Sequence, residues 1–374
     1  MQLKPFLLDM WLDKYEHSLE FNLAASTGPV WTVNEILALD GGSAREHFLH
    51  QELVYGHPAG SESLRTAIAD MQKVSPEAVQ VTTGASEALL VLTWLAAEPG
   101  ANVILPKPGF PTFAALPESL GLETRFYSIR KENDFRIDLD EIRKLSDAHT
   151  KLILVNNPHN PTGATVSDEE MESLHEFTSA RGIQLISDEV YHPIYHGRQT
   201  QSAARLPHAT VIHDFSKAFP LAGVRTGWMV EHDPKRRQQY WNARAFFSVS
   251  NSTAGEMLAE IAMRKRDIVL KRTQEAASRN LEILDRFMND RRETLGWIRP
   301  RGGMTAFPWL ASGENSRPLC EAAAERGVVL APGESFDVPS HFRLGFAASE
   351  SEFPRGLERL GEVIQSWSRK RAVA

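Results

Sequence analysis

The sequence predicts an α/β protein built on a mostly parallel β-sheet with helices on both faces. Between about residues 60 and 230, short β-branched runs alternate with amphipathic stretches. Repeated strand–helix–strand order favours a parallel sheet, because each return to the sheet needs a crossover helix. The 374 residues are enough for two domains, and 42% hydrophobic with 24% charged residues is typical of an ordered globular protein.

Five segments of the alternating region predict strands. They are Val79–Thr83, Asn102–Leu105, Lys151–Val155, Ile183–Ile186 and Thr210–Ile212. Residues 167–181 predict a helix, because their Ser-Asp-Glu-Glu start is a favourable helix N-terminus. In open α/β sheets, chemistry gathers in the loops that follow the carboxyl ends of the strands. The residues after these five segments are therefore the first candidates for a functional site.

The character of the sequence changes after Val230. Residues 252–289 predict one long helix rich in Ala, Glu, Leu and Arg. The remainder, with turns predicted at Pro300–Gly303 and Ala331–Gly333, predicts a smaller α+β domain, and the first thirty or so residues are expected to pack with it. We therefore expect an N-terminal arm that belongs in part to the small domain over 1–40, a large domain over 41–280 and a small C-terminal domain over 281–374.

Charge and composition indicate an enzyme acting on small molecules. The net charge of −7 disfavours binding to nucleic acid or to acidic membranes. Cys320, the single cysteine, cannot form an intramolecular disulfide and is predicted to be a core residue, which favours a reducing compartment. The N-terminus lacks signal-peptide features, and the most apolar segment, Ala88–Ala97, is too short to span a bilayer. We predict a cytoplasmic protein.

The segment 213–228 carries the strongest chemical signal. A predicted strand ends shortly before Ser216 and Lys217, and Arg225 follows the lysine by eight residues. Desolvation of a lysine at a strand end lowers its pKa and favours Schiff-base formation. An arginine nearby offers a planar pair of donors to a phosphate. Two glycines are expected to permit close backbone approach here: Gly223 and Gly227.

This segment resembles the cofactor-lysine signature of the class I and II aminotransferases, which are fold-type I enzymes that use pyridoxal 5′-phosphate (PLP). The family pattern is Ser-Lys, a short apolar run and Gly-x-Arg-x-Gly, and further matches extend from Tyr55 to Arg343. The resemblance implies an aspartate aminotransferase-like fold, with a large PLP-binding domain on a mostly parallel seven-stranded sheet flanked by helices and a smaller α+β domain. It also implies PLP bound as a Schiff base (internal aldimine) on Lys217, and no metal.

The resemblance assigns roles to residues that follow other strands. Asn160, in Asn-Pro-His-Asn-Pro-Thr-Gly, matches the residue that hydrogen-bonds the cofactor's O3′ and helps to bind substrate. Asp188 matches the carboxylate that keeps the pyridine nitrogen protonated, so that the ring is an electron sink. Tyr191 matches a tyrosine directed at O3′. Phe110 matches the aromatic side chain that lies against the ring, with a simple core aromatic as the alternative interpretation.

The cofactor's phosphate is expected at a helix N-terminus. Small residues after the first predicted strand leave backbone N–H groups free for an anion, and the resemblance adds Ser216 and Arg225 to this site. The backbone donors are predicted at Gly84, Ala85 and Ser86. Asp214 departs from the family pattern, because many relatives carry Ser or Thr at that position. An acid beside a dianionic phosphate is costly, so Asp214 is expected to turn away or to form an ion pair.

Two outlying residues complete the predicted site. Arg343 matches the arginine that binds the substrate α-carboxylate, and a bidentate pair would orient an amino acid over the ring. Tyr55 matches the tyrosine that reaches the phosphate in the neighbouring subunit, which implies a homodimer with shared active sites. The segment 23–28, where relatives contact substrate, shows no pattern that predicts specificity.

The expected activity is transamination between an amino acid and a 2-oxo acid, with Lys217 as general base and acid. Fold-type I enzymes also act at Cα, Cβ or Cγ as lyases, cyclases or oxidases, and segments 8–12 and 214–217 resemble members such as the cyclase that makes capreomycidine. A non-catalytic regulator is disfavoured because the segment before Tyr55 is too short for a DNA-binding domain. A nicotinamide dehydrogenase is disfavoured because no Gly-x-Gly-x-x-Gly follows the first strand.

Overall fold

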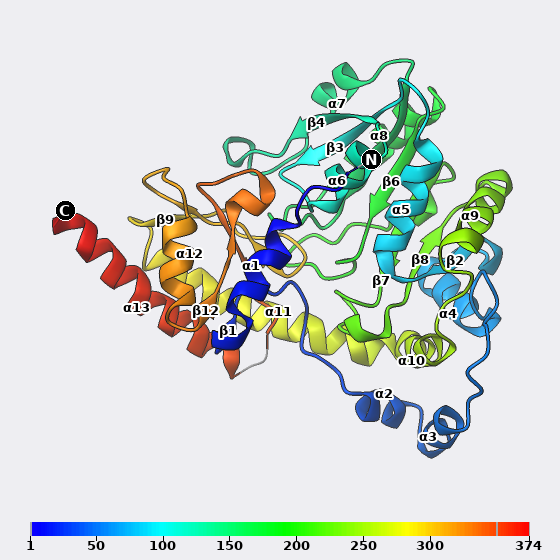
Figure 1. Ribbon diagram of the computed structural model, residues 1–374, viewed down its shortest axis with the longest axis horizontal. Coiled ribbons are helices and arrows are strands. Elements are labelled where there is room, and N and C mark those ends of the chain that lie inside the picture. Colours follow the sequence, from blue (N-terminus) through cyan, green and yellow to red (C-terminus); the bar gives the residue numbers. More distant parts are fainter. Residues whose placement is uncertain (1, 349–350, 374) are drawn as a thin grey trace.

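The computed structural model describes residues 2–348 and 351–373, and its centre is a seven-stranded sheet (Figure 1). The strand order is β2-β8-β7-β6-β5-β3-β4. Strand β8 runs antiparallel to both β2 and β7, whereas the remaining neighbours pair in parallel. The predicted mostly parallel, seven-stranded α/β sheet flanked by helices is confirmed.

Five of the seven strands coincide with predicted segments, and β4 and β8 were not predicted. The strands are β2 (Val79–Thr82), β3 (Asn102–Lys107), β4 (Glu123–Ser128), β5 (Thr150–Asn156), β6 (Gln184–Asp188), β7 (Ala209–Asp214) and β8 (Gly227–Val230). Strands β2, β7 and β8 are buried along their whole length, as expected where helices cover both faces. Strand β4 lies at the edge and is mostly half-buried or exposed.

Helices connect and cover the strands. They are α2 (Val33–Leu39), α3 (Gly42–Leu49), α4 (Glu62–Gln72), α5 (Gly84–Ala96), α6 (Thr112–Ser119), α7 (Leu139–Leu145), α8 (Asp168–Ser179), α9 (Pro234–Phe247), α10 (Thr253–Arg264) and α11 (Arg266–Asn289). The predicted start of α8 is confirmed by a capping box, in which Ser167 Oγ accepts from Glu170 N at 3.1 Å and Glu170 Oε2 accepts from Ser167 N at 2.8 Å.

The single helix predicted over 252–289 is wrong, because α10 ends at Arg264 and α11 starts at Arg266. Tertiary packing explains the break at Lys265. Helix α10 packs against α4 and α2, whereas α11 extends towards the C-terminal region and contacts α13 (Figure 1). The two helices thus serve different parts of the molecule.

Within the described residues, the C-terminal region holds strands of three small sheets and two α-helices. One sheet pairs β9 (Leu295–Gly296) with β11 (Trp309–Leu310), and a second has the order β10 (Thr305–Ala306), β14 (Phe342–Gly345) and β13 (Ala331–Pro332). The third contains β12 (Val328–Val329), and the helices are α12 (Arg317–Ala324) and α13 (Glu352–Val373). The turn predicted at Ala331–Gly333 is wrong, because Ala331–Pro332 pair with β14. Cys320 is buried in α12, as predicted. Within the described ranges, no helix combines the length and apolar character needed to cross a bilayer.

The N-terminal segment packs on this C-terminal region, as predicted (Figure 1). Helix α1 (Leu7–Tyr15) anchors there through Trp11 Nε1, which donates to Leu330 O at 2.7 Å. Strand β1 (Phe21–Asn22) pairs in parallel with β12. Gly345 N then donates to Leu23 O at 2.7 Å. These contacts lay the segment after β1 across β14, while the domain limits at residues 40 and 280 stay a prediction.

Candidate active site

The carboxyl ends of β5, β6 and β7 bring the predicted chemical groups together. Asn156, the last residue of β5, is in register with Asp188, the last residue of β6. Strand β7 lies beside β6 and ends at Asp214, and Lys217 follows three residues later. Neighbouring parallel strands present their carboxyl ends at one edge of a sheet, so an amide, two carboxyls and an amine meet there.

Lys217 is partly buried at this edge, and its Nζ donates to Ser26 Oγ at 3.1 Å. Burial lowers the pKa of the Lys217 amine, and the positive charge of Arg343 lowers it further. The carboxyls of Asp214 and Asp188 act in the opposite direction on this pKa. The net lowering favours the neutral amine, which is the form that attacks carbonyl carbons and accepts protons.

Asp188 is a buried carboxyl, and its Oδ1 accepts a hydrogen bond from the backbone at Val190 N, 3.2 Å away. Burial raises the pKa of Asp188 to about 7, and the nearby carboxyls of Asp214 and Glu189 raise it further while Lys217 lowers it. Such a group is stabilised as a carboxylate when a cation is placed against it. A protonated pyridine nitrogen would be such a cation.

This raised pKa predicts a pH effect on the cofactor-free protein. An unfolded aspartate titrates at about 3.9, so between that pH and about 7 the folded chain holds a proton at Asp188 that the unfolded chain releases. Stability should therefore fall as pH rises through this window, by at most about 1.4 kcal/mol per pH unit from this group. Thermal unfolding between pH 5 and 7 should show a shallower decline for Asp188→Asn. Equal slopes would show that Asp188 titrates normally.

The buried Glu189 provides a matched control for this measurement. Burial also raises the pKa of Glu189 to about 7, and its Oε1 accepts from Ser187 Oγ and from Ala203 N, at 2.9 and 2.8 Å. Glu189→Gln should therefore also flatten the decline in the cofactor-free protein. Bound cofactor should remove the contribution of Asp188 and leave that of Glu189, since only Asp188 is expected to meet the pyridine nitrogen.

Arg343 lies on β14 and is 3% exposed, and among the described residues its hydrogen-bond partners are neutral acceptors. Its Nη1 donates to Asn160 Oδ1 at 3.2 Å, and its Nη2 donates to Ala24 O at 2.7 Å. Within the described residues, Nε has no partner. Burial lowers the pKa of Arg343. A desolvated guanidinium with spare donors is suited to a carboxylate.

Tyr191 adds a buried hydroxyl that has no hydrogen-bond partner within the described part of the chain. Burial raises the pKa of Tyr191 to about 12, while the positive charge of Arg343 and the hydroxyl of Ser26 lower it. The phenol therefore stays protonated at neutral pH. It can donate a hydrogen bond, as a residue directed at a phenolic oxygen of a cofactor must.

The predicted phosphate donors lie at the start of α5. The Thr83 side chain does not cap this helix, so its first N–H groups must find acceptors on other residues or on a ligand. Gly84 starts the helix with φ +70°, and a Cβ there would lie 3.0 Å from Arg225 Nη2. Ala85 is buried beside it and Ser86 is exposed. The structure therefore brings the helix start and the guanidinium of Arg225 together.

The two glycines predicted to allow close approach differ. A Cβ on Gly227 would lie 2.7 Å from Gly84 C and 2.8 Å from His213 O, so glycine is required where β8 passes the start of α5. A Cβ on Gly223 would meet no protein atom within 4 Å, so no described residue approaches this glycine and its role in close approach stays a prediction. That glycine lies at an open position in the loop.

The expectation for Asp214 is wrong. Its carboxylate points to the phosphate donors instead of turning away, and it forms no ion pair with any residue that the structure describes. Its Oδ1 accepts from Ser216 N at 2.9 Å, and its Oδ2 lies 3.4 Å from Ala85 N. The expectation rested on repulsion between Asp214 and a bound phosphate, and this repulsion is absent when no phosphate is bound.

Two predicted residues lie at the margin of the site. Phe110, in the loop after β3, is partly buried and packs edge-on against Phe6 and Phe113 with ring centroids 5.9 and 5.8 Å away. Its position suits either a ring contact or a core role. Tyr55 is 84% exposed and makes no hydrogen bond or ring contact with the other predicted site residues, all of which lie in the described part of the chain. A single chain thus does not bring Tyr55 to the site, and its role towards a neighbouring subunit stays a prediction.

Sequence reasoning missed two residues that organise the site. Asn156 bridges two loops, since its Nδ2 donates to Asp188 O at 3.1 Å and its Oδ1 accepts from Asn160 N at 2.7 Å. A polar residue at the end of an otherwise apolar strand was an available signal for Asn156. Ser26 contacts Lys217 from a segment 191 residues away, and nothing local in the sequence signals that contact.

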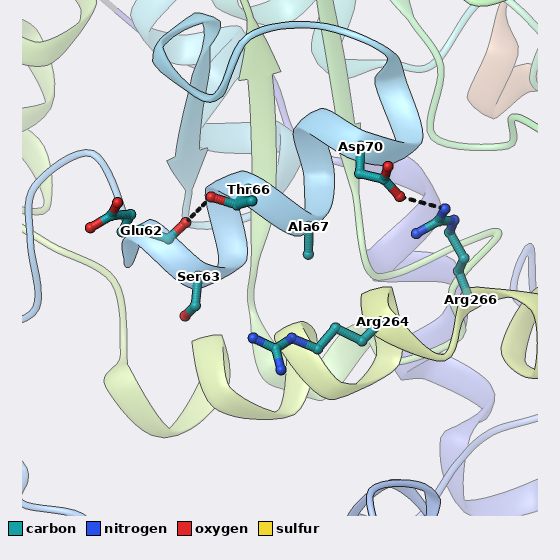
Figure 2. Close-up of a pocket in the computed structure, with 7 residues that line it drawn as sticks. All are labelled: Glu62, Ser63, Thr66, Ala67, Asp70, Arg264 and Arg266. Carbon is teal, nitrogen blue, oxygen red and sulfur yellow. Dashed lines mark hydrogen bonds and ion pairs between the residues drawn. The ribbon is translucent and has the colours of Figure 1, made fainter.

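A separate pocket lies between α4 and the helices α10 and α11 (Figure 2). An ion pair between Arg266 Nη2 and Asp70 Oδ2, 2.7 Å long, closes one end of it. Its lining residues are Glu62, Ser63, Thr66, Ala67, Asp70, Arg264 and Arg266. None of these is a predicted site residue, so this pocket is distinct from the edge of the sheet where Lys217 lies.

The residues at the sheet edge fit PLP. Among the described residues, a lysine with a lowered pKa, a buried carboxyl in no ion pair, a buried hydroxyl without a hydrogen-bond partner and a helix start beside an arginine match its aldehyde, ring nitrogen, phenolic oxygen and phosphate. Lys217, Asp188, Tyr191 and Arg225 supply the four groups. Each unsatisfied protein group thus has a counterpart of suitable charge on one small molecule.

Comparisons with known proteins agree with this geometry. The family model described as "Aminotransferase class I and II" matches residues 43–360. A capreomycidine synthase from Streptomyces vinaceus is 28% identical over 97% of this chain and 95% of its own length. An aspartate/prephenate aminotransferase from Thermus thermophilus is 29% identical over 86% of each chain. The crystal structure of a PLP-dependent aminotransferase from Streptococcus suis superposes with a TM-score of 0.92, at 28% identity, over 98% of this chain and 99% of that one.

Proposed function

The chain belongs to the aminotransferase class I and II family of PLP-dependent enzymes, and on this premise we propose that it transfers an amino group between an amino acid and a 2-oxo acid. The buried guanidinium of Arg343 carries the proposal, because its hydrogen-bond partners among the described residues are the neutral oxygens of Asn160 and Ala24. A buried cation without a counter-ion is costly, and a bidentate α-carboxylate would supply one. Both proposed substrates carry that carboxylate.

In this proposal each site residue has one task. When bound, PLP supplies an electron sink that stabilises negative charge at the substrate Cα. Lys217 Nζ would remove the Cα proton as a general base and then deliver a proton to the C4′ carbon of the cofactor as a general acid, and its lowered pKa suits both tasks. Arg343 fixes the carboxylate so that the Cα–H bond is held near Nζ. Asp188 holds the ring nitrogen in its protonated form.

The remaining residues bind and orient the cofactor. Tyr191 and Asn160 would hold its phenolic oxygen, and Asn156 keeps Asn160 in place through the 2.7 Å hydrogen bond to its backbone. The phosphate would be held by a set of donors at the start of α5 and in the loop after β7: Gly84, Ala85, Ser86, Ser216 and Arg225. Phe110 would cover the ring, and Tyr55 would act on the phosphate in a neighbouring subunit of a homodimer.

A different outcome at Cα, Cβ or Cγ is the second candidate. It is favoured by the capreomycidine synthase, whose match extends over more of the chain than that of the aspartate/prephenate aminotransferase. Lyase, cyclase and oxidase reactions would use the same lysine and the same carboxylate-binding arginine. They differ from transamination in whether the cofactor keeps the substrate's nitrogen.

A half-reaction experiment tests the proposed function. Purified protein with PLP is mixed with single amino acids, without any 2-oxo acid. We expect one amino acid to convert the visible cofactor spectrum to that of pyridoxamine phosphate with release of one equivalent of a 2-oxo acid. Adding a 2-oxo acid should restore the spectrum, and steady-state kinetics should be ping-pong. Product formation with no amine form of the cofactor would instead indicate the second candidate. Failure to bind PLP would exclude both.

A further inference from the structure

Asp214 occupies the place where the cofactor's phosphate should find its donors. The carboxylate is 6% exposed at the end of β7. Its Oδ1 accepts from Ser216 N at 2.9 Å and from Ser216 Oγ at 2.7 Å, while Oδ2 contacts Ser216 Oγ at 2.7 Å and Ala85 N at 3.4 Å. Asp214 therefore takes donors from both sides of the predicted phosphate site, the loop after β7 and the start of α5.

The surroundings show that this carboxylate faces the interior of the site. A Cβ on Gly84 would lie 3.0 Å from Arg225 Nη2 and 4.0 Å from Asp214 Oδ2, so the guanidinium and the carboxylate both approach the start of α5 at this glycine. Other charged or titratable groups act on Asp214 or are acted on by it: Lys217 in the same loop, Asp188 on β6, Tyr191 after β6 and His213 on β7. From the first turn of α5, Glu87 pairs with Arg244 at 3.1 Å, and its Oε2 also accepts from Thr83 N at 2.5 Å.

A phosphate ester cannot join this arrangement as a full dianion without a large cost. Its second pKa is about 6, so above neutral pH it brings two negative charges to donors that a carboxylate already uses. Two anions in hydrogen-bond contact in a partly desolvated site repel strongly. A single proton between them removes this repulsion, since it turns the contact into a short charge-assisted O–H···O⁻ hydrogen bond.

Resting on the proposed PLP function, we propose that Asp214 makes phosphate binding proton-linked. On binding, one proton from solvent is taken up and shared between a phosphate oxygen and the Asp214 carboxylate. The cofactor's affinity then falls as pH rises, by up to about tenfold per pH unit above the second phosphate pKa. A serine or threonine at this position would donate to the dianion directly and would need no proton.

Calorimetry with pyridoxamine 5′-phosphate and cofactor-free protein tests this. This ligand carries an amine in place of the aldehyde and forms no bond with Lys217, so the lysine's own chemistry does not enter. Titrations at pH 8 in buffers of different ionisation enthalpy give the number of protons taken up. We expect the wild type to take up about one proton more per site than Asp214→Asn. Pyridoxamine, which lacks the phosphate, should show no such difference.

Affinity gives a second readout. Asp214→Asn should bind pyridoxamine 5′-phosphate at least about tenfold more tightly than wild type at pH 8, with a flatter pH dependence. Asp214→Ser should behave like Asp214→Asn, which guards against a folding defect in one variant, and circular dichroism checks both. Equal proton uptake by wild type and both variants would overturn this inference and leave the proposed function intact. Absence of phosphate-dependent binding in all three proteins would overturn both.

Discussion

Lys217→Ala should abolish the visible absorption band of the bound cofactor and lower turnover by about 10⁴-fold or more. The amine is the one predicted nucleophile of the site, and its Nζ lies 3.1 Å from Ser26 Oγ at the sheet edge. An alanine leaves no group to bond the cofactor or to move the Cα proton. The absorption spectrum of purified protein reconstituted with PLP, followed by single-turnover kinetics, measures both losses.

Lys217→Arg and Lys235→Ala are the matched controls. The arginine keeps a positive charge at the site but is not a Schiff-base former at neutral pH, so it should fail as Lys217→Ala does. Lys235 lies exposed at the start of α9, and its loss should change neither band nor rate. A Lys217→Ala protein that retains the band would mean that another residue holds the cofactor, which would contradict the assignment.

Arg343→Gln should reduce kcat/KM for amino acids by about 10²- to 10³-fold, equivalent to roughly 3–4 kcal/mol for losing one partner of a buried charge pair. Its guanidinium donates to neutral oxygens of Asn160 and Ala24, so the substitution breaks no ion pair among the described residues that would stabilise the fold. The cofactor band should persist, because Arg343 is assigned to the substrate. Steady-state kinetics on both half-reactions measures the effect.

Arg343→Lys and Arg299→Gln sharpen this test. A lysine keeps the charge without the planar pair of donors, so it should recover only part of the loss. Arg299 pairs with Glu282 on the surface, where a single ion pair is worth little, and its substitution should leave kinetics unchanged. If Arg343→Gln lowered the rate with carboxylate-free amines as much as with amino acids, the arginine would not be the carboxylate site.

The sequence predicts those elements of this fold whose formation depends on neighbouring residues in the chain. Strands β2, β3, β5, β6 and β7 are visible because each is a short apolar run between turn residues. Strand β4 has the sequence Glu-Thr-Arg-Phe-Tyr-Ser. Because it lies at the edge of the sheet, it keeps polar residues exposed, and its sequence therefore resembles that of a loop. Strand β8 has four residues and directly follows the Lys217 loop, so its pairing with β2 and β7 was not evident.

The site shows the same division. Lys217, Asp188 and Asn160 follow recognisable strands within motifs, and parallel pairing alone brings them to one edge. Ser26 and the backbone of Ala24 enter from the N-terminal segment, whose position depends on packing against β14 rather than on any nearby pattern. The direction of the Asp214 side chain also could not be predicted from the sequence, because it depends on hydrogen-bond donors from two separate elements.

The packing of the N-terminal segment on the C-terminal region has a consequence for biosynthesis. The contacts Trp11–Leu330 and Ala24–Arg343 each join residues 319 positions apart. A ribosome makes Trp11 and Ala24 long before their partners, so these contacts can form only after residues 330 and 343 have been made. Contacts of such high sequence separation form slowly, and they close the largest loops. The lysine half of the site can therefore assemble earlier during translation than the carboxylate-binding half, which needs Arg343.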